Sequence, residues 1–164
     1  MINGTERDGA IRPNQIFAVS LPYTMLSDTR AQRVVVAVER ALLTPYGLRS
    51  LAPCDPQYCG HLVGDPASRD SSYHQGTVWA WLMGPFITAF LKVHGASSYG
   101  RQQAAQWLAG LRRHISDAGL GHVSEVFDGD PPHLPRGCIA QAWSVAEILR
   151  AAVEIGRLNT KIKT

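Results

Sequence analysis

The segment from Gly121 to Asp130 carries the densest group of side chains suited to catalysis. Its sequence, GHVSEVFDGD, places the carboxylates of Glu125, Asp128 and Asp130 close together. Glycines lie among the acids and two prolines follow them, a composition typical of a turn that displays polar groups. Such a turn can supply a general base, bind a cation or hydrogen-bond sugar hydroxyls. A solvated acidic turn without a chemical role is the alternative.

Glu125 is the best candidate for acid-base chemistry among these acids. Val123, Val126 and Phe127 are its apolar neighbours in the sequence. Apolar surroundings disfavour the charged form of a carboxylate, which raises its affinity for a proton and suits it to proton transfer at neutral pH. The pattern favours Glu125 as a catalytic carboxylate, provided that these side chains gather around it.

A second polar run, RDSSYHQG from Arg69 to Gly76, leads into an apolar segment with two tryptophans. Sugar rings stack on aromatic side chains while their hydroxyls bind charged and amide groups, so the run predicts a carbohydrate platform. The alternative is a loop with local ion pairs and tryptophans in the core. On a helix, Trp79 and Trp81 diverge by about 200°, so at most one can face a given cleft. Trp107 and Trp143 lie on apolar stripes and are predicted to be core residues.

The spacing of potential ligands does not favour a metal site. The acids around Asp128 lack the calcium-loop pattern, with its glutamate twelve residues after the first ligand. Cys54, Cys59 and His61 have the wrong spacing for zinc and lack a fourth ligand. We therefore expect no metal.

Composition limits the class of protein. The chain has 164 residues, 45% of them apolar, which is enough for one domain over residues 1–164 with a real core. The net charge is only +3 and no basic run exceeds Arg112-Arg113, so a nucleic-acid partner is not expected. Three cysteines, an odd number, favour a reducing compartment and a cytoplasmic location. The apolar stretch 78–93 is interrupted by Gly84-Pro85 and is shorter than the roughly 20 residues of a membrane span.

Helical periodicity dominates the chain, and alternating strand patterns are weak, so the sequence predicts an all-α fold. Two segments without helical period, 44–75 and 117–137, are expected to be long loops that carry most of the polar chemistry. The predicted helices cover about 15–20; a segment that follows Ser27-Asp28 and ends before Pro45; 76–93, with a kink or break at Pro85; a segment that starts at Ser97 or Ser98 and carries the stripe 104–115; and 139–155, with Gly156 past its end.

Five blocks of sequence occur together in one order. They are RPNQIFAVSLP (12–22), GLRSLAP with DP and GD after it (47–65), RDSSYHQGTVWAW (69–81), GPF (84–86) and GHVSEVFDGDPPHLPRGCIAQAWSVAE (121–147). Over roughly residues 9–152 the chain resembles the C-terminal part of the amylo-alpha-1,6-glucosidase domain of the glycogen debranching enzyme family. The resemblance implies an (α/α)6 toroid of twelve helices, inverting hydrolysis of the alpha-1,6 branch glucose, and no metal or organic cofactor. Ala80 departs from the family, which usually has proline there.

The resemblance also implies roles for individual residues. Glu125 takes the position of the family's general base, which activates water on the face opposite the leaving oxygen, in agreement with the interpretation from the residues alone. The other matched positions that line the family's cleft are expected to bind substrate, and Asp128 of the acidic segment is included with them. This set is Arg12, Asn14, Gln15, Arg49, Asp65, Arg69, Asp70, Tyr73, His74, Gln75, Trp79 and Asp128.

Inversion requires a second carboxylate, the general acid, about 6.5 to 9.5 Å from the base. In the family that acid lies upstream of the part matched here. We therefore expect a partial (α/α)6 toroid of the six-hairpin glycosidase type, with about five of the twelve helices and two long loops. An open arc exposes apolar helix faces, which the upstream half would cover, in cis or as a partner chain.

The leading hypothesis is that the chain is the general-base half of a glucosidase acting on branched alpha-glucan, such as glycogen or limit dextrin, and is inactive alone. A non-catalytic glucan-binding or scaffold module derived from the same toroid is the first alternative. A related toroid hydrolase for another alpha-glucoside, such as trehalose, is the second.

Overall fold

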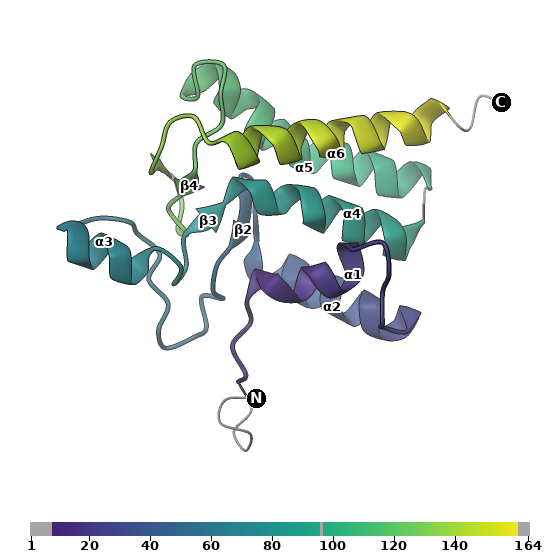
Figure 1. The fold of residues 1–164 in the computed structure, drawn as a ribbon, viewed down its shortest axis with the longest axis horizontal. Helices are drawn as coiled ribbons and strands as arrows, with labels where there is room; N and C mark the ends of the chain where they lie inside the picture. Colours follow the sequence, from purple (N-terminus) through teal and green to yellow (C-terminus); the bar gives the residue numbers. More distant parts are fainter. Residues whose placement is uncertain (1–7, 96, 161–164) are drawn as a thin grey trace.

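The computed structural model describes residues 8–95 and 97–160, and within these ranges the chain is rich in helix with one small sheet (Figure 1). The 3₁₀-helices are η1 (Pro13–Ile16) and η2 (Ala80–Leu82). The α-helices are α1 (Phe17–Ser20), α2 (Asp28–Leu42), α3 (Pro66–Ser72), α4 (Met83–His94), α5 (Ser98–Asp117) and α6 (Ala142–Thr160). None of these helices is long and apolar enough to cross a membrane.

Helix α4 lies at the centre of the helical layer, between α1 and α2 on one side and α5 and α6 on the other (Figure 1). Phe86, Ile87, Phe90 and Leu91 are all buried, so most of the helix surface is covered. A helix that is apolar on nearly every side is stable only inside such a layer. Hydrophobic contact with α4 therefore fixes how the other helices are arranged.

The predictions for α2, α5 and the short helix at 15–20 are confirmed. Helix α5 begins after Ser97, whose hydroxyl accepts a hydrogen bond from the Gly100 amide at 3.1 Å, as the cap prediction requires. Ser27 also occupies the cap position of α2, but its side chain makes no capping hydrogen bond. Trp107 of α5 is partly buried and packs on Phe86 and Phe90.

The all-α prediction is wrong because the long segments between the helices build a five-stranded antiparallel sheet. Its strands lie in chain order: β1 (Leu43–Thr44), β2 (Gly47–Arg49), β3 (Val78–Trp79), β4 (Val126–Phe127) and β5 (Pro135–Arg136). Strands of two or three residues are too short to show an alternating pattern. The two predicted loops thus contain regular structure, β2 and α3 in the first and β4 and β5 in the second.

The predicted helix at 76–93 is wrong in its first part. Val78–Trp79 pairs with β2 and β4, Ala80–Leu82 forms η2, and α4 begins at Met83. Pro85 therefore lies in the first turn of α4, where the missing N–H is not needed, instead of interrupting a longer helix. Gly47 of β2 has φ +146°, and a Cβ there would lie 2.3 Å from the Trp79 carbonyl oxygen, so glycine permits this close approach of β2 to β3.

Helix α6 presents a different face to the core than the one predicted. Its expected apolar stripe is largely exposed, Trp143 at 64%, and Gly156 lies within the helix rather than past its end. The buried face consists of Ser144, Ile148, Ala151 and Ile155. The expected exposure of apolar helix faces is confirmed for α6.

A groove of about 510 Å³ runs between α5 and α6 and adds to this exposed apolar surface. Ile115 and Leu108 of α5 and Leu149 and Ala152 of α6 are among the residues that line it, and Arg112 lies at the same groove. Contiguous exposed apolar surface is a feature of interaction sites.

Candidate active site

The sheet gathers three remote segments around Glu125. This residue directly precedes β4, Cys138 follows β5, and Tyr73 lies at the end of α3. The Glu125 amide donates to the Cys138 carbonyl oxygen at 2.9 Å, which continues the pairing of β4 with β5. Backbone pairing therefore sets the position of Glu125.

Both carboxylate oxygens of Glu125 accept hydrogen bonds. The Tyr73 hydroxyl donates to Oε1 in a short contact, and the Cys138 amide donates to Oε2 at 2.9 Å. No ion pair within the described part of the chain involves Glu125. Val126 and Phe127, expected around the carboxylate, belong to the hydrophobic core. The groups bound to this carboxylate are thus polar and uncharged.

Tyr73 connects Glu125 to a cluster of aromatic rings. Its ring meets Trp79 edge-on, with 4.9 Å between the ring centroids, and His74 stacks on Trp79 at the same distance. Burial raises the pKa of the Tyr73 hydroxyl, and the hydrogen bond to Glu125 raises it further. The phenol therefore keeps its proton at neutral pH and remains a hydrogen-bond donor.

A hollow of about 380 Å³ lies beside these rings, and we call it the tryptophan hollow. Pockets of about 300 to 1,000 Å³ are typical of small-molecule sites. Aromatic rings combined with an arginine and an amide suit a sugar, which offers apolar ring faces and hydroxyls. The hollow is lined by Arg12, Pro13, Asn14, Ser50, His74, Trp79, Trp81, Leu82 and Trp143.

Two predictions for the tryptophans are wrong. Trp79 and Trp81 both line the hollow because this stretch is a strand followed by a 3₁₀-helix, not the α-helix that would have separated them. Trp143 is not a core residue, since it lines the same hollow from α6 and meets the Trp81 ring edge-on at 6.0 Å. Sequence reasoning missed Trp81 and Trp143 as candidate site residues.

Arg12 holds the rim of the tryptophan hollow together. Its guanidinium donates to the carbonyl oxygens of Ser50 and His74, at 3.2 and 2.9 Å, and to Oε1 of Gln75 at 2.7 Å. The Gln15 side-chain amide donates to the Arg12 carbonyl oxygen at 3.1 Å. Four of the predicted binding residues therefore line the hollow: Arg12, Asn14, His74 and Trp79. Two more, Gln15 and Gln75, do not line it but are hydrogen-bonded to Arg12.

The comparison with known families decides which kind of protein this is. The family model described as amylo-alpha-1,6-glucosidase matches residues 1–150. The chain belongs to this family. It is also similar to the glycogen debranching enzyme of Saccharomyces cerevisiae (strain ATCC 204508 / S288c), with 28% identity over 161 residues. That match covers 87% of this chain and 10% of the yeast protein, so the chain spans about a tenth of the length of this curated relative.

Within this amylo-alpha-1,6-glucosidase family member, three of the predicted binding residues lie on or next to α3, which projects beyond the sheet (Figure 1). Asp65 caps α3 by accepting from the Ser68 amide at 2.8 Å, a hydrogen bond that lowers the pKa of its carboxyl. Arg69 donates to the Gly64 carbonyl oxygen at 2.6 Å, and Asp70 is exposed. None of these three lines the tryptophan hollow.

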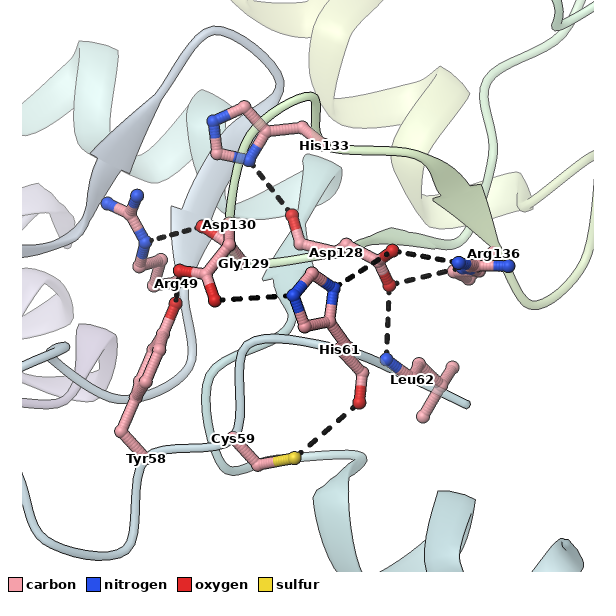
Figure 2. Close-up of polar contacts among 10 residues, drawn as sticks. All are labelled: Arg49, Tyr58, Cys59, His61, Leu62, Asp128, Gly129, Asp130, His133 and Arg136. Carbon is pink, nitrogen blue, oxygen red and sulfur yellow. Dashed lines mark hydrogen bonds and ion pairs between the residues drawn. The ribbon is translucent and has the colours of Figure 1, made fainter. Parts of the chain in front are cut away.

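Asp128 lies in a separate polar network that joins the two long segments (Figure 2). It is 2% exposed and accepts from Arg136 at 2.9 and 3.1 Å and from the Leu62 amide at 3.0 Å. His61 Nδ1 lies 3.4 Å from the same carboxylate. Burial acts to raise the pKa of Asp128, but the hydrogen bonds from Arg136 and Leu62 outweigh it and lower the pKa. Asp128 is therefore an anion fully occupied by protein groups.

Asp130 and Arg49 extend this network (Figure 2). The Tyr58 hydroxyl donates to Asp130 at 2.8 Å, and burial, reinforced by that bond, raises the Tyr58 pKa to about 12. His61 Nε2 lies 3.6 Å from Asp130, and Arg49 donates to the Gly129 carbonyl oxygen at 2.8 Å. Within the described residues, no group of three or more His, Cys, Asp or Glu side chains is placed to hold a metal ion.

Proposed function

We propose that this chain provides the general-base half of a site that hydrolyses alpha-1,6-linked branch glucose in glycogen or limit dextrin with inversion. Membership of the amylo-alpha-1,6-glucosidase family supports the reaction and the substrate class. The observation that carries the proposal is the place of Glu125, a carboxylate without a cationic partner among the described residues, joined through Tyr73 to the ring cluster of the tryptophan hollow.

In this mechanism Glu125 accepts a proton from a water molecule as the water oxygen bonds to the anomeric carbon. The bond from that carbon to the leaving oxygen breaks, and the general acid gives the leaving oxygen its proton. Attack opposite the leaving group inverts the anomeric configuration. The two neutral donors on Glu125 leave lone pairs on its oxygens for the water proton.

We propose that the residues of the tryptophan hollow and its rim bind the glucose unit and that those of α3 bind the adjoining chain. The first group is Arg12, Asn14, Gln15, Tyr73, His74, Gln75 and Trp79, and the second is Asp65, Arg69 and Asp70. Arg49 and Asp128 bond to protein groups, and for them we propose an indirect role, holding the loop that carries Glu125.

The general acid is proposed to come from polypeptide upstream in the same toroid, in cis or as a partner chain. The exposed apolar face of α6 and the groove between α5 and α6 support this, because additional helices packed there would bury them. The isolated chain is then inactive. Release of glucose by the isolated chain would contradict this and would require a local acid such as Asp70 or Asp130.

The test is Glu125→Gln in the full-length debranching enzyme that carries this segment. Glucose release from a branched limit dextrin should fall by about 100-fold or more, because general-base catalysis contributes about 10²- to 10⁴-fold. Dextrin binding, measured by isothermal titration calorimetry, should be retained. Turnover close to that of the wild type would refute the assignment.

A glucan-binding module without catalysis is the second candidate. The residues that line the tryptophan hollow include no carboxylate, which favours binding over chemistry at that place. Titration of maltodextrin into the isolated chain discriminates between the two. Tight binding without turnover, together with an active full-length Glu125→Gln enzyme, favours the module.

A further inference from the structure

The seat of the Glu125 carboxylate is built by three groups that come from separate segments. Tyr73 holds one oxygen and the Cys138 amide holds the other. The third is Gly137, whose lack of a side chain makes room, because a Cβ there would lie 2.3 Å from Oε2 of Glu125. Gly137 also has φ +66°, a conformation that favours glycine.

Two donors on two oxygens fix the plane of a carboxylate, whereas a single donor leaves it free to rotate. The Cys138 donor is a backbone amide and cannot be altered by substitution of its side chain, so Tyr73 is the side chain that completes the seat. Its ring is itself packed against Trp79 and His74, both of which line the tryptophan hollow. Tyr73 thus connects the orientation of Glu125 to the wall of the hollow.

We propose that Tyr73 is a positioning residue for Glu125, which orients the carboxylate through its hydroxyl rather than by contact with the sugar. This inference rests on the proposed function. The ring of Tyr73 keeps its place in the cluster proposed to bind glucose, while its hydroxyl aligns the base.

The test is Tyr73→Phe in the full-length enzyme, with glucose release from limit dextrin measured from pH 4 to 8. We expect kcat to fall by about 10- to 100-fold, because small misplacement of a catalytic group has effects of this size. KM should stay within about twofold, since the ring remains in the cluster. The pH profile of kcat/KM should differ from that of the wild type, which loss of ring packing alone would not cause.

Tyr46→Phe is the matched control. The Tyr46 ring stacks on Phe127 of β4 at 4.7 Å, and no hydrogen bond of its hydroxyl is found within the described residues. This variant should keep the wild-type pH profile. A Tyr73→Phe enzyme with wild-type kcat and pH profile would overturn the positioning role, while an active Glu125→Gln enzyme would instead overturn the proposed function.

Gly137→Ala tests the same seat from the other side and leaves Tyr73 untouched. Its Cβ should displace the carboxylate and lower kcat by about 10- to 100-fold. Gly95→Ala is the control, because Gly95 also has a positive φ, +68°, and a Cβ there would meet no described atom within 4 Å, so this variant places a side chain at positive φ without a steric clash. Equal activity of the two variants would overturn the proposal, and thermal melting confirms that each is folded.

Discussion

Glu125 and Asp128 lie three residues apart on either side of β4, yet their surroundings differ sharply. Asp128 is buried and bound by the guanidinium of Arg136, a backbone amide and His61. Glu125 is half-buried and bound by two neutral donors, Tyr73 and the Cys138 amide. Within the described residues, a cation compensates the charge of Asp128, whereas no cation compensates the charge of Glu125.

This difference separates a structural acid from a candidate base. A carboxylate paired with a guanidinium has little tendency to take a proton, because the cation stabilises its charge. Neutral donors orient a carboxylate but leave its charge available for a substrate or water. The same short segment thus provides an anchor for the two long loops and a group free to react.

The largest effect on stability is expected for Asp128→Asn, which removes the carboxylate that anchors the two long loops. The change leaves Arg136 without its anion and weakens the bond to the Leu62 amide, so the free energy of unfolding should fall by about 2 to 3 kcal/mol. Chemical denaturation measures it. Glu125→Gln is the matched comparison and should lose less, about 1.5 kcal/mol, because only one donor loses its acceptor and no cation is left unpaired. Equal losses in the two variants would remove the distinction between anchor and base.

The pH dependence of the anchor follows from the lowered pKa of Asp128. Its stabilisation is fully present above the ordinary carboxyl value of 3.8 and is lost as the pH falls through the lower pKa of the folded state. The stability difference between wild type and Asp128→Asn should therefore be constant above about pH 5 and shrink below about pH 4. Burial lowers the pKa of His114, which weakens both proteins equally in acid and cancels in the difference. A difference that grows in acid would contradict the assignment.

The smallest effect on stability is expected for His61→Asn, which removes the imidazole beside Asp128 and leaves Arg136 in place. The His61 side chain is 52% exposed and lies 3.4 and 3.6 Å from Asp128 and Asp130, so solvent weakens its interaction with both carboxylates. Denaturation should show a loss of at most about 0.5 kcal/mol. A loss as large as that of Asp128→Asn would mean that His61, not Arg136, compensates the buried acid.

The sequence predicts the long helices well because apolar periodicity sets them locally. The sheet cannot be predicted in this way, because Val78 and Phe127 pair although they are far apart in the chain, and each of their strands has only two residues. The signal for α3 was present: Asp65 followed by Pro66 is a typical helix start, but the helix is too short to show periodicity. The buried face of helix α6 was predicted wrongly because its most apolar stripe is the one that stays exposed.

The candidate site was predictable residue by residue but not in its geometry. Motif resemblance selects Glu125 and Tyr73, yet nothing in their spacing indicates that the tyrosine donates to the carboxylate. Trp81 and Trp143 were missed because both lie in stretches assigned to buried helix. Their roles depend on how remote segments pair, which a single sequence does not display.

The central claim is that Glu125 activates the water in alpha-1,6-glucoside hydrolysis. Its most direct test is Glu125→Ala in the full-length enzyme, assayed on limit dextrin with and without sodium azide. Without azide, glucose release should fall by about 100-fold or more, and azide, which needs no base, should restore turnover and yield the beta-glucosyl azide. Glucose release near the wild-type rate without azide, or an azide product of alpha configuration, would contradict the account.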